Sequence, residues 1–492
     1  MNERGIRRLT KGSAGWLPLC LMLSACAVGP DFQPPPPPAV ASFDVAPLPP
    51  AERAAEPGPA LVAASDLPVR WWELFQYPEL ETTLRQVVAG NNTLVAARQT
   101  LAQAQQAVIS ARAPLFPQVT AQGSATRSGS GLFLPRGSGA AASSYGVGAT
   151  VNEALDVFGL TRRSVEQQEA LVDNQRYQLA EAYLTLTGGA VTEAIAIAAA
   201  RLEIATLLDL IDSDQRNLDL VQRKFDVGKA ARSDVLTAES QLLGDRAQLA
   251  SQRQQLSVAR HALTVLASRT PAEWVPPDFD LEAFQLPAEI PLSVPSALVR
   301  QRPDILAAEA QLHAASAAVG VATAQLYPSL TLSAALTQQG RSLDTLFQGA
   351  GSLWSLGGGV TAPLFNAGAL SAQKQAAVDA FEAQYATYRQ TVIVAFGQVA
   401  DALRALEHDA DTLSAARRSL EVAGESLGLQ RASYAAGKSS VLDLLSVQRS
   451  YSQARLSYAA AQIQRDQDVV QYFVVLGGGW RGVGLPDALS GD

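Results

Sequence analysis

Residues with reactive or metal-binding side chains are scarce in this chain. Its 492 residues include only two cysteines, two methionines and three histidines. Both cysteines, Cys20 and Cys26, lie near the N-terminus, so the body of the chain has no thiols for an internal disulfide. The histidines, His261, His313 and His408, lie far apart in the sequence, and we find no paired metal-ligand motif and no glycine-rich phosphate loop. The sequence therefore argues against an enzyme and predicts no cofactor or metal site.

Two further absences concern partners and membranes. The formal net charge is −8, and no excess of basic residues is present to attract nucleic acid, so we expect no nucleic-acid partner. Beyond residue 70, no uncharged apolar run reaches the ~18 residues that a transmembrane helix requires. The body of the chain is therefore predicted to contain no transmembrane helix.

The N-terminus predicts export and lipid attachment. Several basic residues within residues 1–15 precede a short apolar stretch, Trp16–Leu23, and then Leu23-Ser-Ala-Cys26. This order is typical of a secretory signal, which we place at residues 1–25. The last four residues resemble a bacterial lipobox, which implies a diacylglycerol on the Cys26 thiol and a third acyl chain on its amine. The alternative is an ordinary signal in which Cys26 is incidental. By analogy with bacterial lipoproteins, Ala27 favours transfer to the outer membrane.

The chain after the signal is a proline-rich linker followed by two copies of one large unit. Residues 26–70 are rich in proline and alanine, as expected of an extended, lipid-anchored spacer. Phe225-Asp-Val-Gly-Lys229 then returns as Tyr434-Ala-Ala-Gly-Lys438, 209 residues later. Likewise Leu115-Phe-Pro117 returns as Leu326-Tyr-Pro328, 211 residues later. Two distant motifs that recur at nearly the same offset predict a tandem duplication. We place the first repeat at 71–270, an equatorial segment at 271–303, the second repeat at 304–475 and a C-terminal tail at 476–492.

Long helices dominate both repeats. Residues 159–225 and 368–434 contain no proline and are rich in helix-forming residues, so each predicts one continuous helix of ~100 Å. Each ends in a glycine-containing tip, at 226–232 and 435–440, and a shorter helix is expected to return from it. The remaining predicted helices cover residues 92–113, 233–268, 304–325 and 440–472.

Four segments alternate between apolar and small polar residues, which is the pattern of β-strands. They form two predicted hairpins, at 115–156 and 326–365. Small uncharged polar faces suit a barrel wall around a watery lumen, although a soluble hairpin shows the same alternation. Four strands cannot remain open in lipid and are too few to close a barrel. We therefore expect several copies to assemble. Three copies give twelve strands and twelve helices under cyclic symmetry, and the arithmetic alone also allows other multiples.

Several motifs together make the chain similar to the TolC-type outer-membrane factors, in particular their NodT/OprM-like lipoprotein branch. The matching residues are Cys26 with Val28-Gly-Pro-Asp-Phe32, Trp71-Trp72, Asp156-Val-Phe-Gly159, Gln301-Arg-Pro-Asp-Ile305, Pro363-Leu-Phe-Asn-Ala-Gly368, both Gly-Lys tips and Leu476-Gly-Gly-Gly-Trp480. The resemblance implies a mostly α protein with a transmembrane β-barrel. Each duplicated protomer would contribute four strands and long helices to a trimeric 12-stranded β-barrel and a 12-helix periplasmic α-barrel.

The resemblance also assigns candidate site residues. Hairpin tips of the family meet a periplasmic adaptor, which implies docking at Val227, Gly228, Lys229, Ala436, Gly437 and Lys438; the Gly-Lys pairs also suit helix capping. A periplasmic gate is implied at Asp234, Tyr434, Leu442, Asp443 and Arg449. Ser439 and Ser446 stand where some relatives have Arg and Asp, which puts a full latch in doubt. Asp234 could instead cap its helix, and Asp443 could simply be solvated.

The predicted function is a passive exit duct of a tripartite efflux pump. The expected partners are two further copies of the chain, a periplasmic adaptor, an inner-membrane pump of the resistance-nodulation-division type, and outer-membrane lipid. No catalytic, cofactor or metal residue is expected, apart from the covalent lipid on Cys26. The alternatives are an outlet for type I protein secretion and a periplasmic scaffold lipoprotein without a pore.

Overall fold

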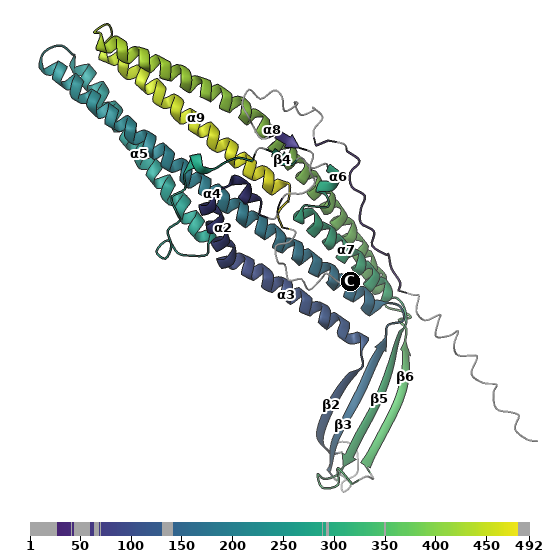
Figure 1. Ribbon diagram of the computed structural model, residues 1–492. Coiled ribbons are helices and arrows are strands. Elements are labelled where there is room, and N and C mark those ends of the chain that lie inside the picture. Colours follow the sequence, from purple (N-terminus) through teal and green to yellow (C-terminus); the bar gives the residue numbers. More distant parts are fainter. Residues whose placement is uncertain are drawn as a thin grey trace, which may run out of the picture. The chain divides into compact units, whose positions relative to one another are not determined.

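The computed structural model describes residues 27–40, 42–43, 60–62, 68, 70–129, 141–287, 289–291, 295–348 and 351–480. Within these residues the chain is mainly helical, with one four-stranded sheet (Figure 1). The predicted signal, Cys26, most of the linker and the end of the tail lie outside the described residues.

The helices follow the proline-free segments of the sequence. The two longest, α4 (Leu160–Asp226) and α8 (Ala369–Ala435), have 67 residues each. The prediction placed them at 159–225 and 368–434. Each is followed by a 35-residue return helix, α5 (Arg232–Leu266) or α9 (Val441–Val475). The shorter helices are α2 (Pro78–Gly90), α3 (Asn92–Arg112), α6 (Pro295–Leu298) and α7 (Pro303–Ala324), with 3-10 turns η2 (Trp71–Phe75), η3 (Ala113–Leu115) and η4 (Leu281–Ala283).

The strands β2 (Gln118–Ser128), β3 (Ala142–Leu155), β5 (Ser329–Gly340) and β6 (Ser352–Thr361) form one antiparallel sheet in the order β2-β3-β5-β6. The central pairing of β3 with β5 joins the two repeats within one chain. A separate pair, β1 (Ala60–Val62) with β4 (Glu289–Pro291), is parallel. The outer strands β2 and β6 pair with no further strand among the described residues, so each leaves one backbone edge open.

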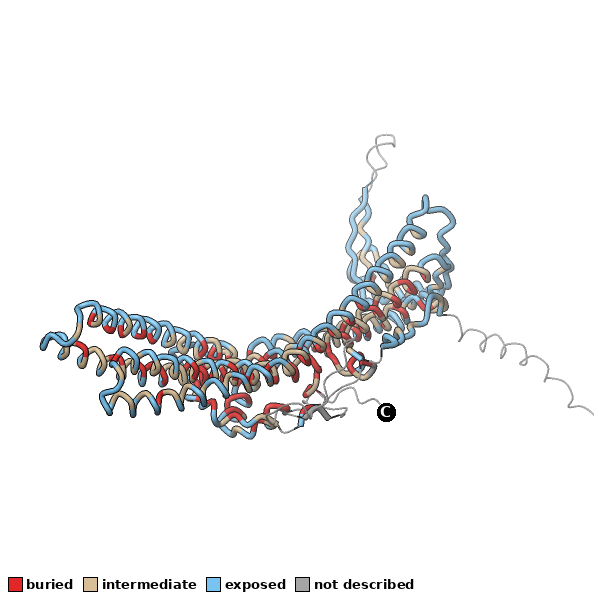
Figure 2. Tube along the Cα trace, turned by 90° about the horizontal axis from the view of Figure 1, so that it is seen from above, coloured by how far each residue is buried: buried red, intermediate tan, exposed pale blue. Residues whose placement is uncertain are grey.

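The two faces of the sheet differ in polarity. The strand register places Val119, Val151, Ala334 and Leu356 in one row across the sheet, and Ala121, Ala149, Leu336 and Trp354 in the next. Rows on the other face carry Thr120, Thr150, Ala335 and Ser355, or Gln118, Asn152, Ser333 and Gly357. The apolar side chains are exposed, with Trp354 at 79% and Leu356 at 78%, and Figure 2 shows the strands in the colours of exposed and half-buried residues. An exposed apolar face of this kind suits lipid rather than water.

The chain forms two compact units, and these do not coincide with the two sequence repeats. The first unit combines the described residues up to Pro35 with Leu101–Gln175 and Ala308–Tyr388, and contains the sheet. The second combines Pro36–Thr100, Arg176–Ala307 and residues from Arg389 onwards, and contains both helical hairpins. Each unit therefore draws segments from both repeats.

An aromatic cluster and a buried arginine organise the second unit. Trp71 and Phe75 are fully buried and pack against Phe473 of α9, with ring centroids 5.5 and 6.4 Å away. Arg302 donates from Nη1 to the carbonyl oxygen of Val475 at 2.9 Å, and from Nη2 to Asp304 at 2.6 Å. These contacts give the Trp-Trp and Arg-Pro-Asp motifs a structural role, because they fix the end of α9.

Among the described helices, α7 alone has the length and mean hydropathy of a candidate membrane span. Its Ile305, Leu312 and Ala317 are nevertheless almost completely buried within the protein. A helix that packs its apolar side chains inside the protein is a core helix, so we do not assign α7 to lipid.

Candidate functional site

The two hairpin tips have the same backbone geometry. At the first tip, the amide of Gly228 donates to the carbonyl of Phe225 at 2.9 Å, and the amide of Lys229 donates to the carbonyl of Lys224 at 2.7 Å. At the second, Gly437 donates to Tyr434 at 3.0 Å and Lys438 to Ser433 at 2.9 Å. This is the Schellman termination of a helix. It requires a left-handed residue, and the glycines supply it with φ values of +68° and +71°.

The tips are also open to partners. Val227 is 67% exposed, and Ala436, Gly437 and Lys438 are exposed as well. A Cβ added to Gly228 or Gly437 would meet no atom within 4 Å. Capping therefore uses the backbone of each tip, and its outer surface stays free for a partner.

The two candidate gate aspartates both cap the helices that leave the tips. A carboxylate oxygen of Asp234 accepts the backbone amide of Ala231 at 3.0 Å. A carboxylate oxygen of Asp443 accepts the amide of Ser440 at 2.9 Å and its hydroxyl at 2.7 Å, while the Ser440 hydroxyl accepts the amide of Asp443 at 3.1 Å. The bonds from Ser440 lower the pKa of Asp443. Within one chain, both carboxylates thus hold the first turns of α5 and α9.

Tyr434 lies between the two hairpins of one chain. Its ring packs against a cluster formed by Val221, Val235 and Val441, which come from α4, α5 and α9. The Lys224 ammonium lies 5.4 Å from the ring centroid, a cation–π arrangement. Tyr434 therefore helps to join the first tip to the second.

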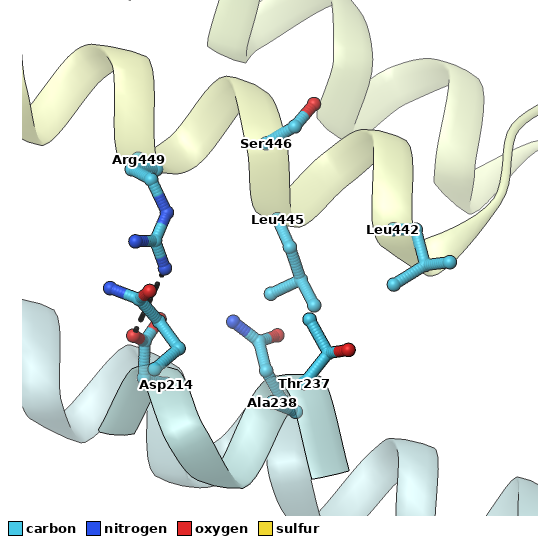
Figure 3. A pocket seen from close by; sticks show the side chains of 9 residues that line it. Asp214, Thr237, Ala238, Leu442, Leu445, Ser446 and Arg449 are labelled. Carbon is cyan, nitrogen blue, oxygen red and sulfur yellow. Dashed lines mark ion pairs between the residues drawn. The ribbon is translucent and has the colours of Figure 1, made fainter. Parts of the chain in front are cut away.

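The other two candidate gate residues, Leu442 and Arg449, line a pocket between the first hairpin and α9. The cavity has a volume of about 310 Å³. In Figure 3, Leu445 and Arg449 extend from α9 toward Asp214, Thr237 and Ala238 on the facing helices, whereas the Ser446 hydroxyl points away from them. Arg449 forms an ion pair with Asp214, with 3.9 Å between Nη2 and Oδ2. The guanidinium side chain is 47% exposed, whereas that of Asp214 is 9% exposed.

Asp214 belongs to a buried pair of carboxyl groups. Asp245 of α5 lies beside it and is itself only 6% exposed, while Gln241 donates to both Asp245 oxygens at 3.1 and 3.2 Å. Burial is the main cause that raises the pKa of Asp214 to about 7, and the neighbouring Asp245 adds to it; Arg449 acts in the opposite direction. The raised pKa of Asp214 favours its protonated form well above the pH at which an exposed aspartate ionises.

The acid pair is a feature of the hairpin that the sequence analysis did not predict. Leu207, Leu210, Asp214, Asn217 and Val221 follow heptad spacing along α4, and Val235, Ala238, Leu242, Asp245 and Leu249 follow it along α5. Both aspartates thus occupy core positions of a helical hairpin. Acidic residues at such positions weaken packing but define the register of the helices. Heptad counting could have revealed them.

The second hairpin contains its own buried acids, at a different place. Burial raises the pKa of Asp409 to about 7, assisted by the charge of Asp468. Burial also raises the pKa of Asp466 to about 6, against the effect of Arg465, whose Nη2 lies 3.1 Å from it. By the 209-residue offset, these residues have no acidic counterparts in the first repeat.

Cys26 lies outside the described residues, but the residues after it are firmly held. The amide of Val28 donates to the carbonyl of Phe158 at 3.1 Å. Arg163, with a side chain 7% exposed, donates from Nε to Val28 at 3.2 Å and from Nη2 to Asp31 at 2.7 Å. A Cβ on Gly29 would lie 2.5 Å from Cα of Gly320, so only glycine fits there. The chain directly after the predicted lipid site is thus clamped to the start of α4.

No group of three or more histidine, cysteine, aspartate or glutamate side chains within the described parts of the chain is placed to hold a metal ion.

Known proteins resemble this chain over most of its length. The family model described as "Outer membrane efflux protein" matches residues 83–269 and 294–478, one stretch in each repeat. Nodulation protein T of Rhizobium leguminosarum bv. viciae is 31% identical over 483 residues, covering 94% of this chain and 92% of the relative. The pyoverdine export outer membrane protein OpmQ of Pseudomonas aeruginosa is 29% identical, covering 85% of this chain and 89% of the relative. Among solved structures, the outer-membrane channel OprN superposes with a TM-score of 0.83 at 27% identity, over 93% of this chain and 100% of that one.

Proposed function

This chain belongs to the outer membrane efflux protein family, and we propose that its two helical hairpins form the regulated entrance of an efflux channel. The channel itself follows from the family: the protein is an outer-membrane transport component and not an enzyme. It works as a homotrimer with a periplasmic adaptor and an inner-membrane pump of the resistance-nodulation-division type. The predicted exit duct, with its helical barrel and β-barrel, is thereby confirmed.

The observation that best supports a pore is the open four-stranded sheet, which has one apolar and one polar face. Its unpaired edges are unstable in hydrocarbon unless neighbouring copies cover them. The test is to reconstitute the detergent-extracted protein in planar bilayers. We expect a mass of three protomers and discrete conductance steps. A protein that remains monomeric and silent would refute the duct.

We propose that the tips dock the adaptor through Val227, Gly228, Lys229, Ala436, Gly437 and Lys438. Support comes from their exposure and from the identical geometry of the two turns, which presents the same shape twice per protomer. Site-specific photocrosslinkers at Val227 and Ala436 should capture an adaptor in cells, whereas one at Leu243, exposed along α5, should not.

We propose that the gate includes Asp234, Tyr434, Leu442, Asp443 and Arg449, with two kinds of role. Asp234, Asp443 and Tyr434 keep the tips in shape through capping and packing. Leu442 and Arg449 form the movable contact, because both line the pocket and a single ion pair, between Arg449 and Asp214, crosses it. Replacing Asp234 and Tyr434 together by Ala should increase entry of a bulky antibiotic into cells. Unchanged entry would argue against these two positions.

We propose that Cys26 carries the lipid anchor. The clamp around Arg163 supports this, because it holds the chain two residues after the cysteine and so fixes where acyl chains would emerge. Mass spectrometry of the N-terminal peptide should find a triacylated cysteine. Cys26→Ser should abolish the modification while trimers still form, and an unmodified wild-type peptide would overturn the assignment.

We propose that the cargo consists of small molecules chosen by the pump. Relatives are named for pyoverdine export in OpmQ, for toluene efflux in TtgC and for antibiotic efflux in ArpC, three chemically different cargoes. Such variety fits a duct that conducts whatever it is given. Exchanging this chain for a relative in one pump should therefore preserve the range of compounds exported.

A further inference from the structure

The internal duplication defines how two protomers meet in the membrane. The two hairpins of the sheet are equivalent strand by strand. In the first, Gln118 pairs with Asn152 and Thr126 with Ser144. In the second, Ser329 pairs with Thr361 and Thr337 with Leu353. Both comparisons relate β2 to β5 by 211 residues and β3 to β6 by 209.

The same offsets hold outside the sheet. Gly159 and Gly368, 209 residues apart, have φ values of +82° and +84° just before α4 and α8. The Leu-Phe-Pro and Leu-Tyr-Pro sequences before β2 and β5 are 211 residues apart. The two hairpins are therefore copies in backbone and register, and not only in sequence.

One junction between repeats is observed within the chain. There, β3 of the first repeat pairs with β5 of the second, with Val151 opposite Ala334 and Thr150 opposite Ala335. The next such junction would pair β6 with the β2 strand of another copy. Shifting Val151 by 209 gives Val360, and shifting Ala334 back by 211 gives Gly123.

We infer that β6 of one protomer pairs antiparallel with β2 of the neighbouring protomer, with Val360 opposite Gly123 and Gly359 opposite Ser124. The partner is a second copy of this chain, and the inference rests on the trimeric channel proposed above. It adds the residue-level register of the seam, which closure alone does not determine. With the same stagger at both junctions, three protomers form a barrel of six equivalent hairpins.

Side-chain polarity gives an independent check, because it did not enter the derivation. The seam places Leu364 opposite Val119 and Gly358 opposite Ala125, continuing the apolar face from one protomer to the next. It places Thr361 opposite Gln122 on the polar face. A slip of one residue would bring Val360 opposite Gln122 or Ser124 and mix the faces.

Disulfide trapping tests the register. The natural cysteines are Cys20 and Cys26, so the body of the chain is a cysteine-free background. The test variant is Val360→Cys with Gly123→Cys, where a Cβ on Gly123 meets no atom within 4 Å. Val151→Cys with Ala334→Cys is the matched control for the observed junction within one chain. Pairs slipped by two residues, Val360→Cys with Ala121→Cys or Ala125→Cys, test neighbouring registers on the same face.

After oxidation in membranes, the test pair should give covalent dimers and trimers on non-reducing gels. Because a disulfide needs Cα atoms within about 7 Å, we expect at least about fivefold more product than with the slipped pairs. The control pair should react without a change in mass, and single-cysteine variants should give neither product. Stronger cross-linking in a slipped pair would overturn the register while leaving the channel intact. Reaction of the control alone, in a protein that forms trimers, would overturn the seam. A monomeric protein would refute the channel as well.

Discussion

At the scale of single residues, the two tip glycines are needed for their backbone and not for lack of space. Gly228 and Gly437 have left-handed φ values, while a Cβ at either position would touch nothing. Gly→Ala at both tips should therefore lower the stability of the hairpins by about 1 kcal/mol each through backbone strain alone. Chemical denaturation followed by circular dichroism in detergent measures the change.

Gly244 provides the control, because it lies within α5 and its missing Cβ would also meet open space. There the same substitution should stabilise the helix by roughly 0.5–1 kcal/mol, since alanine is the better helix former. If Gly→Ala changed stability in the same direction at the tips and at Gly244, the assignment of the tips as left-handed caps would be contradicted.

The buried acid Asp214 predicts a pH dependence with a definite sign. Its pKa is about 7 in the fold, raised from 3.8 mainly by burial, so the folded protein binds a proton that the unfolded chain releases above pH 4. Stability should therefore fall as pH rises from 4 through 7 and stay low above it. Asp214→Asn should reduce this slope, to which Asp409 and Asp466 also contribute, and raise stability at pH 8 by roughly 1–3 kcal/mol. Thermal unfolding in detergent between pH 5 and 8 measures it.

Asp443 is the matched contrast to Asp214. Its pKa is lowered by hydrogen bonds from Ser440, so the stability that it adds is present above its unfolded pKa and is lost only as pH falls below about 4. Asp443→Asn should leave the slope between pH 5 and 8 unchanged. An equal flattening by both substitutions would show that the slope does not originate at Asp214.

At the scale of elements, Arg163 provides the polar side-chain contacts that hold the N-terminal segment, beside the Val28–Phe158 backbone bond and the stacking of Phe32 on His313. Arg163 holds Val28 and Asp31, whereas among the described residues its neighbour Arg162 bonds to Asp156 and Val157 at the same helix end. Arg163→Ala should release residues 27–35 and speed their proteolysis about tenfold or more, because opening then exposes the backbone. Arg162→Ala should leave the cleavage rate near that of the wild type, although it too removes an ion pair. Similar rates in both variants would mean that the clamp does not restrain the segment.

The helices and strands were accessible from sequence because each obeys a local rule. The absence of proline from 159–225 and 368–434 and the period-two alternation of the strands required no tertiary information. The helix-capping roles of Asp234 and Asp443 were harder to predict from the sequence. The capping box of α9 can be read from Ser440 and Asp443, but the residue before α5 is Ala231, which has no capping side chain. The Asp214–Asp245 contact depends on which faces of α4 and α5 meet, and the clamp joins residues more than 130 positions apart.

At the scale of the whole molecule, the internal duplication of each protomer predicts how neighbouring protomers pair. The family match falls on both repeats, and one junction between repeats is already visible inside the chain. The acid pairs break this symmetry, since Asp214 and Asp409 occupy different positions in their hairpins. The barrel wall is therefore near-sixfold, whereas the entrance is threefold. We therefore expect the residues that control opening of the entrance to lie at positions where the two repeats differ.

The gate should open when the contact between α9 and the first hairpin is lost. Arg449→Ala removes the ion pair with Asp214 across the pocket, while the packing of Val441 against Val235 of α5 remains. An ion pair to a mostly buried carboxylate is worth more than an exposed one, so its loss should shift the trimer toward the open state. We expect a single-channel open probability several times that of the wild type in planar bilayers without adaptor. Arg455→Ala is the control, because Arg455 also joins α9 to α4, at 3.2 Å from Asp209, but that aspartate is 73% exposed. It should leave the conductance unchanged, and equal opening by both variants would place the gate elsewhere on α9.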